Sequence, residues 1–506
     1  MSAFTYPGVY IQELSSGVHT ITGVATSIAA FAGWAPKGPT TEAVLVQSFS
    51  DYQRQFGGLD ARSYLGYAVN QFFANGGQQA YIVRLAWTDA AVAKVSVGGL
   101  TLWALGPGLY ANGLQVTVTS TSATAFNLQV LNASSVVLET FLNLSATSAV
   151  AVIDNDSQYV TFVSPATGLA PVSITVPAAT ATVALAGGLD GTVLMAKDGV
   201  NGASGDFETA LNVAGAVTLP APLTGVRLLD RVDIFNLLCV PGEADETTVS
   251  ALTGYCNTER AFFIVDCPQI ATAANLGSGP IGAASSGFSG NFLDHSAYYF
   301  PWIQAPDPLA NNRPRLFPPS GSVAGIYAFT DANRGVWKAP AGIDASLTGV
   351  SGLQYVLTDG ENGTLNPQAI NCLRQFRVYG DVVWGARTLQ GNDQAGSQWK
   401  YVPIRRLALF LESSLYDGTQ WVVFEPNDET LWGQIRLNVG AFMQGLFLQG
   451  AFQGTTPQQA YFVKCDSENN PQASIDLGIV NILVGFAPLY PAEFVVIQIQ
   501  QMAGQI

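Results

Sequence analysis

The order of hydrophobic and polar positions divides this chain into stretches of different character. Leu65, Val69 and Phe72 recur at helical spacing, and residues 80–85 follow as an apolar run of strand length. The same alternation of helix-like and strand-like segments resumes over residues 206–266. Strands that alternate with helices predict an α/β fold with a largely parallel sheet.

The stretch between residues 91 and 200 has a different pattern. Residues 114–119 and 126–130 alternate apolar and polar side chains, as half-buried strands do. The stretch is dense in Val, Thr, Ser, Ala and Leu, and residues 154–157 are typical of a hairpin turn. Short strands at regular spacing predict an inserted all-β domain, a sandwich or a barrel.

Both ends of the chain have a strand-like pattern without neighbouring strands. Residues 9–13 and 493–500 alternate at strand period, and a second β-like run follows at 18–28. An isolated strand leaves its backbone N–H and C=O groups unpaired, so it is most stable when added to another sheet. That sheet could belong to another subunit, or each end could fold back as an edge strand of its own subunit.

Composition excludes some functions. The 506 residues include 21 Lys and Arg against 36 Asp and Glu, a formal charge of −15, and only 11% of residues are charged. An acidic chain lacks the basic face that neutralises phosphates, which argues against direct nucleic-acid binding. The length predicts three or four domains. Few charges and many apolar residues suggest that partners cover much of the surface.

Cysteines and targeting signals indicate a cytoplasmic product. The five cysteines include no CxxC pair, which fits reduced, buried thiols. The start has no secretory pattern, and no segment reaches the ~18 uninterrupted apolar residues that span a bilayer. We therefore expect assembly in the bacterial cytoplasm without membrane insertion.

Catalytic and cofactor motifs are weak. The two histidines are His19, in an extended run, and His295, among aromatic residues. Ser320 lacks a GxSxG frame and is typical of a turn serine. No P-loop or GxGxxG motif follows a strand. The sequence therefore predicts no enzyme activity, no cofactor and no metal site.

Several motifs in combination resemble the contractile tail-sheath family of myophage tails, contractile bacteriocins and extracellular contractile injection systems. They are YPGVYIQE at 6–13, TGVATS at 22–27, YYFPW at 298–302, PSGSVAG at 319–325, DANRGVWKAPAG at 331–342, WGARTL at 384–389, Arg405-Arg406, WVVFEPN at 421–427 and GAF at 450–452. The resemblance runs nearly from end to end.

The resemblance implies a fold and a domain order. It implies a multidomain α/β protein with a subtilisin-like α/β core that lacks a catalytic triad, an inserted all-β domain and extended strand arms at both ends. The expected divisions are an N-terminal arm at 1–25, the first part of the α/β core at 26–90, the β insertion at 91–200, the subtilisin-like domain at 201–365, a C-terminal α/β domain at 366–484 and a C-terminal arm at 485–506.

The resemblance also implies a function. The chain is expected to polymerise with itself as a helical homo-oligomer of stacked hexameric rings around an inner tube protein, and to contract so that the tube is driven through a target envelope. Further expected partners are baseplate proteins, terminal cap proteins and sister sheath proteins. The particle is expected to be a phage tail virion or an extracellular contractile particle.

The expected site residues are structural. The resemblance implies that the arms reach neighbouring subunits, and the residues expected to pair there are Val9, Ile11, Glu13, Phe494, Val496, Ile497 and Ile499. Candidate hinges that could absorb a dihedral change are Gly17, Gly23, Pro488 and Pro491.

A contact with the tube is the last expectation. The segment 367–379 has a helical pattern that places Arg374 and Arg377 on one face, where they could face an acidic tube. Salt bridges within the domain or to a neighbour explain these arginines equally well. Two other functions stay open for the whole chain, a serine hydrolase that uses the α/β domain and a static tube or capsid protein.

Overall fold

The computed structural model describes residues 19–498, except 166, 203, 214–222, 281–287 and 289–291. The expected arm residues Val9, Ile11, Glu13 and Ile499 and the expected hinge Gly17 lie outside the described residues. The chain divides into two compact units. We call residues 25–406 the core unit, and the described residues 19–24 and 407–498 the terminal unit.

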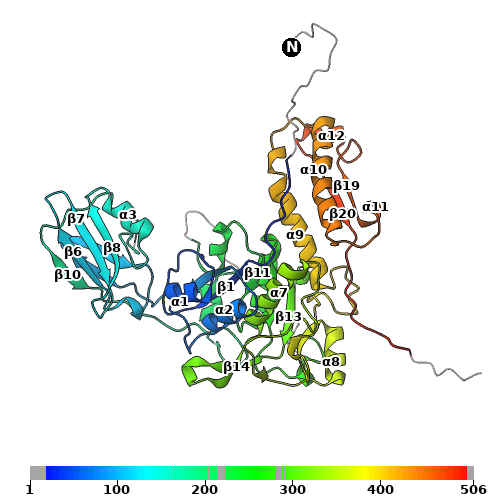
Figure 1. Cartoon of the computed structure of the whole chain (residues 1–506), viewed down its shortest axis with the longest axis horizontal. Coiled ribbons are helices and arrows are strands. Elements are labelled where there is room, and N and C mark those ends of the chain that lie inside the picture. Colours follow the sequence, from blue (N-terminus) through cyan, green and yellow to red (C-terminus); the bar gives the residue numbers. More distant parts are fainter. Residues whose placement is uncertain are drawn as a thin grey trace, which may run out of the picture. The chain divides into compact units, whose positions relative to one another are not determined.

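The core unit is built on an eight-stranded sheet, of which β1, β11 and β13 are labelled in Figure 1. Its strands in spatial order are β18 (Gly380–Val383), β17 (Ile370–Phe376), β13 (Ser296–Phe300), β12 (Phe262–Asp266), β11 (Leu237–Cys239), β1 (Ala29–Trp34), β3 (Ala80–Leu85) and β2 (Val44–Val46). The six inner strands are parallel, and β18 and β2 are antiparallel at the two edges. The expected α/β fold is confirmed.

Helices cover both faces of this sheet, which explains why its strands are apolar on both sides. One face carries α1 (Phe49–Phe56), α2 (Leu65–Ala74) and α7 (Ser320–Arg334). The other carries α4 (Asp206–Leu211) and α5 (Glu246–Thr258), and α6 (Ala273–Leu276) and α8 (Asp359–Leu365) pack against each other. A small sheet of β14 (Ile303–Asp307), β15 (Arg313–Phe317) and β16 (Gly352–Leu353) follows β13.

Two glycines of α7 let it pack closely on α2. A Cβ on Gly321 would lie 2.4 Å from the Ala68 carbonyl oxygen, and one on Gly325 would lie 2.6 Å from Asn75 Cβ. The PSGSVAG motif therefore has a packing role here. Ser320 is the first residue of α7 and is fully buried, so the expectation of a turn serine is wrong.

The inserted region has its own apolar core. It consists of the four-stranded sheet β10 (Ala181–Ala184), β6 (Gln115–Ser120), β7 (Phe126–Leu131) and β8 (Val137–Leu144), a second sheet of β4 (Lys94–Val97), β5 (Leu100–Ala104) and β9 (Val160–Thr161), and helix α3 (Ala149–Asp156). Buried residues from Ala93 to Leu185 form its core cluster. Residues 154–157 end α3 and do not form a hairpin turn, because Asp154 accepts hydrogen bonds from Thr161 and Phe162.

The terminal unit is mainly helical. Helix α9 (Val402–Gly418) begins in the core unit, and its residues from Leu407 onward belong to the terminal unit. Then come α10 (Glu429–Leu448), α11 (Pro457–Ala460), α12 (Gln472–Asp476) and a two-stranded sheet of β19 (Tyr461–Lys464) and β20 (Leu483–Phe486). Among the described residues, no helix has the length and apolar character that a membrane crossing requires.

Two further sequence-based expectations need correction. Residues 19–28 contain no strand, because the first strand begins at Ala29. The helix expected at 367–379 is wrong: β17 and β18 form a hairpin there and complete the large sheet.

Candidate functional site

The crevice where doubly wound sheets bind ligands is closed in this protein. That crevice lies beyond the carboxyl ends of the strands where the strand order reverses, here between β1 and β11. Leu194, Ala196 and Phe207 fill it, leaving a cavity of about 10 Å³. This volume holds about one water molecule, so the usual ligand site of such a sheet is absent from the described residues.

A buried Ser–Asp pair lies at the carboxyl end of β12. The Ser320 hydroxyl and backbone N–H donate to the two carboxylate oxygens of Asp266, at 2.6 and 2.7 Å, and the Gly242 N–H donates to the same carboxylate at 2.9 Å. Burial raises the pKa of Asp266 to about 6. Because both side chains are buried, this pair fastens the first turn of α7 to the sheet and offers no nucleophile to solvent.

The imidazole of His295 contacts Asp294 and Arg405, not Ser320. Its Nδ1 lies 3.2 Å from Asp294 and its Nε2 lies 2.6 Å from the Arg405 guanidinium. The described residues therefore contain no Ser–His–Asp relay through Ser320, since a relay needs the base within hydrogen-bond reach of the nucleophile. They also contain no cluster of His, Cys, Asp or Glu arranged to hold a metal ion.

The Arg405-Arg406 motif anchors the first turn of α9 inside the core unit. Arg405 Nε lies 3.2 Å from Asp294, and Arg406 forms a bidentate pair with Asp331 at 2.6 and 2.9 Å. The Arg406 guanidinium also stacks over the Tyr327 ring, with 4.8 Å to the ring centroid. Sequence reasoning named this motif without partners, because ion pairs between residues 75 or more positions apart leave no local signal.

The two arginines expected to face a tube lie in different surroundings. Arg374 is on β17, where its guanidinium bonds Asp359 at 2.7 Å and the Leu357 carbonyl at 3.3 Å. Arg377 is exposed in the turn between β17 and β18, next to exposed Val378 and Tyr379. The strand does not bring the two cations together as a helix face would.

The described start of the chain packs along the helices of the terminal unit. The His19 N–H donates to Asn438 at 3.1 Å, its ring stacks on Trp421 at 4.2 Å, and the Val24 N–H donates to Ser414 at 3.1 Å. The ring of Phe410 leaves no room for a Cβ on the expected hinge Gly23, at 2.8 Å. Gly23 is thus a close-packing position, and its hinge role stays a prediction.

The small sheet of the terminal unit has two open edges. Ala487 N–H donates to the Ala460 carbonyl at 2.8 Å, so by alternation Phe462 bonds Gly485 and Lys464 bonds Leu483. The backbone groups of Val463 on β19, and of Val484 and Phe486 on β20, therefore point outward, whereas the Tyr461 N–H donates to the Pro457 carbonyl. No third described strand pairs with either edge. A two-stranded sheet of this kind is marginal in water.

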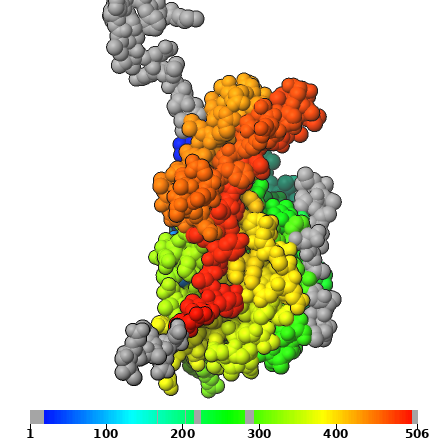
Figure 2. Space-filling view, turned by 90° about the vertical axis from the view of Figure 1, so that its right-hand side faces the viewer, coloured from blue at the N-terminus to red at the C-terminus, as the bar shows by residue number. Residues whose placement is uncertain are grey.

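The described part of the C-terminal arm carries an exposed apolar run. Phe494, Val495, Val496 and Ile497 are 75–81% exposed and form no strand. The segment that contains them is drawn in red at the surface of the space-filling view (Figure 2). It follows the expected hinges Pro488 and Pro491. Pro488 itself forms an isolated antiparallel β-bridge with Phe452. Four consecutive apolar side chains in water are a docking signal.

Comparison with known proteins gives matches over most of the chain. A model of the phage tail sheath protein central domain matches residues 231–389, and one of the phage tail sheath C-terminal domain matches residues 394–502. A prophage protein of Pseudomonas aeruginosa, described as a major tail sheath protein, is 28% identical over 304 residues, which are 58% of this chain and 73% of the relative. The tail sheath protein of Burkholderia phage BcepMu is 27% identical over 301 residues, 56% of this chain and 59% of the relative.

Two solved structures share the fold. The sheath complex of an extracellular contractile injection system in its contracted state has a TM-score of 0.60 at 23% identity, covering 99% of both chains. The helical sheath of the anti-feeding prophage in its contracted state has a TM-score of 0.58 at 24% identity, covering 99% of this chain and 100% of that one.

Proposed function

This chain belongs to the phage tail sheath family, and we propose that it works as a contractile sheath subunit whose copies are joined by their terminal arms. The two family models together match more than half of the chain. The observation that carries the joining mechanism is the β19–β20 sheet, which no third strand of the described residues extends, together with the exposed run at Phe494–Ile497. A strand added by another copy would satisfy both.

The energetics favour this pairing. About four to six backbone hydrogen bonds at ~1 kcal/mol net each give several kcal/mol per arm. Burial of the apolar side chains adds to this, while ordering the arm opposes it. Backbone pairing also suits a lattice that shortens, because hydrogen bonds can hold while Pro488 and Pro491 or the glycines Gly17 and Gly23 absorb the change of direction.

The partners follow from the same family. We propose that copies stack as hexameric rings around an inner tube and meet a baseplate, terminal cap proteins and sister sheath proteins. Neighbours of known structure are described as the baseplate and the helical sheath of the anti-feeding prophage and as the sheath complex of an extracellular contractile injection system. Of the two arginines, Arg377 is the better candidate for the tube because Asp359 already pairs with Arg374.

The α/β core has a structural role in this proposal. We propose a subtilisin-like domain without proteolysis, supported by the filled crevice and by the buried Ser320–Asp266 pair. A fluorophosphonate probe tests it: the chain should remain unlabelled. Labelling that disappears in Ser320→Ala would support the hydrolase alternative.

Truncation of the C-terminal arm tests the joining mechanism. Deletion of residues 493–506 should leave a folded, soluble chain that forms no tubular sheaths in negative-stain images. Within the full chain, Val496→Pro removes one backbone N–H, whereas Val496→Thr keeps it and serves as the matched control. Normal tubes from the truncated chain would contradict the arm mechanism, and a single lattice length in all images would favour a static tube.

A further inference from the structure

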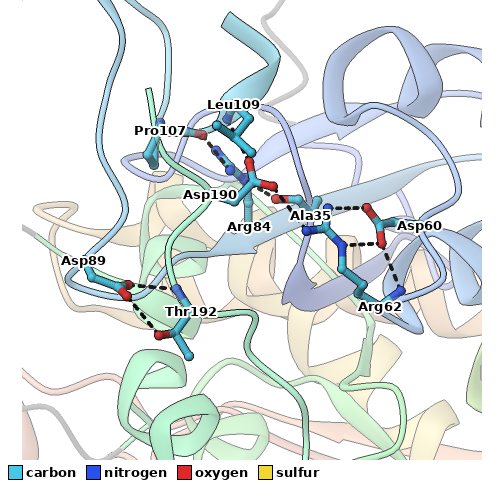
Figure 3. A network of polar contacts seen from close by, with 9 residues as sticks. All are labelled: Ala35, Asp60, Arg62, Arg84, Asp89, Pro107, Leu109, Asp190 and Thr192. Atoms are coloured by element: carbon cyan, nitrogen blue, oxygen red, sulfur yellow. Dashed lines mark hydrogen bonds and ion pairs between the residues drawn. The ribbon is translucent and has the colours of Figure 1, made fainter. Parts of the chain in front are cut away.

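The inserted β region joins the core through a set of contacts that bury a cation. Arg84, on β3, is 1% exposed, and it donates to the carbonyls of Ala35 and Gly38 in the core and of Pro107 in the insertion. Burial lowers the pKa of Arg84 to about 10, so the guanidinium remains charged at neutral pH. One side chain thus bonds three carbonyls from two regions, of which Figure 3 shows those of Ala35 and Pro107.

A second arginine spans the same joint. Arg62 holds Asp60 with a bidentate pair and reaches Asp190 at 3.2 Å. Asp190 in turn accepts from the Leu109 N–H of the insertion at 2.7 Å. This path connects the core to both the first and the last part of the inserted region (Figure 3).

The two connecting segments are also tied to each other. Asp89 on the outgoing segment accepts the N–H and the hydroxyl of Thr192 on the returning one, both at 2.9 Å. Ala91 and Leu189 form an antiparallel bridge beside them. Two connecting segments that are bonded to each other restrict rotation of the insertion relative to the core more than a single linker would.

Backbone packing closes the joint. A Cβ on Gly106 would lie 2.0 Å from the Gly38 carbonyl oxygen, and one on Gly108 would lie 2.6 Å from the Pro36 carbonyl oxygen. Lys37 adds a cation between the Tyr110 and Tyr159 rings of the insertion, 5.7 and 5.0 Å from their centroids. These contacts hold the loops together beside a pocket of about 360 Å³, whose lining includes Glu42 of the core and Asp154 of the insertion.

We propose that Arg84 and its neighbours form a clamp that makes the inserted β region a rigid extension of the α/β core. The clamp comprises Arg84, Arg62, Asp190, Asp89, Thr192 and the glycine contacts around them. Because Arg84 is buried, added salt screens it little, unlike the half-exposed Arg62 pair. In an assembled sheath, the insertion would then turn with its core and not independently.

Single-molecule energy transfer in the full chain tests the clamp. Cysteines introduced at Ser134, in the exposed β7–β8 turn, and at Ala332, exposed on α7, take the dyes, because the five native cysteines are buried. The unmodified clamp should give one narrow distribution that keeps its width in 1 M NaCl. Arg84→Met should broaden it at least twofold, and Arg313→Met, the same change at an exposed site, should not.

Each outcome decides the proposal. A broad distribution with the clamp intact overturns rigidity, and a narrow one in Arg84→Met overturns the role of Arg84. If Arg84→Met fails to fold, Asp190→Asn replaces it, with an intermediate broadening expected from loss of the Arg62 and Leu109 contacts. These measurements on single chains do not depend on sheath assembly, so their failure would leave the proposed function standing.

Discussion

The large sheet of the core unit and the small sheet of the terminal unit differ in how much of each the chain itself covers. Both faces of the large sheet carry helices. At its β18 edge, the Leu347 N–H donates to the Asp381 carbonyl, and the Val383 N–H donates to the Ala345 carbonyl. No third strand of the described residues extends the β19–β20 sheet, and this sheet lies in a unit with exposed apolar residues. The contrast motivates the proposal that another copy of the chain pairs with the small sheet.

The same contrast assigns roles to polar groups. In the core unit, buried charges such as Arg84, Arg406 and Asp266 have their partners within a single chain. In the terminal unit, backbone groups of Val484 and Phe486 lie on a sheet edge that no third described strand extends. Backbone groups suit a repeated assembly contact, since any copy of the chain can supply them.

The largest effect is expected on tube formation, when a backbone N–H at the outward edge of β20 is removed. Val484→Pro deletes an N–H that we place on the open edge of β20, so the chain should fold but form no tubes. Leu483→Pro deletes an N–H that bonds Lys464 and should unfold the small sheet. Electron microscopy with circular dichroism on both variants checks this. Tubes from Val484→Pro would show that the β20 edge is not used in assembly.

The next largest effect is expected on the stability of the core unit, at the close contact between α7 and α2. Gly321→Ala places a methyl group against the Ala68 carbonyl and should lower the free energy of unfolding by about 1–3 kcal/mol. Gly254→Ala, in α5 with open space around its Cβ, is the control and should raise it by up to about 1 kcal/mol. Urea titrations measure both. Equal changes in the two variants would refute the close-packing role of Gly321.

The buried carboxylate gives a pH-dependent effect. Burial raises the pKa of Asp266 from 3.8 to about 6, so between about pH 4 and 6 the folded chain holds a proton that the unfolded chain has lost. Stability from this group therefore falls as the pH rises through that window, by about 3 kcal/mol in total.

The Asp266→Asn variant isolates that group. Relative to the unmodified chain, the variant should gain free energy of unfolding as the pH is raised from 4 to 6, and the difference should stay constant above. Urea titrations at steps of one pH unit measure it. Parallel pH profiles of the two proteins would mean that Asp266 keeps an ordinary pKa.

The smallest effects concern surface arginines. Arg374→Gln loses an ion pair to Asp359, which is 94% exposed, and should cost less than about 1 kcal/mol of unfolding free energy. Arg377→Gln should change stability by no more than about 0.5 kcal/mol. If Arg377 touches the tube, this variant should bind tube protein less tightly in a co-sedimentation assay. Unchanged binding would remove it from the tube contact.

Sequence patterns predicted the core elements well and the hairpin around Arg374 badly. The strands at 80–85 and 262–266 are apolar runs bounded by turns, and a local pattern of this kind is enough for a buried parallel strand. Residues 367–379 mix polar and apolar positions that fit a helix equally well. In the folded chain, residues 370–376 form a strand because they pair with β13 on one side and with β18 on the other.

Only those parts of the candidate site that consist of neighbouring residues in the sequence were predictable. The apolar run at 494–497 stands in the sequence, but the open edges of β19 and β20 depend on which strands meet. The clamp at Arg84 was missed altogether. Its partners are carbonyl oxygens, which every residue carries, so no residue type marks them.

The sequence by itself determined the family, the α/β rhythm, the β-rich insertion and the lack of a recognisable triad, because each depends on residue types at short spacing. Only the tertiary structure decided which cations are buried, which glycines allow close packing and which sheet edges remain open. Those properties arise from contacts between residues tens or hundreds of positions apart, and chain folding alone brings them together.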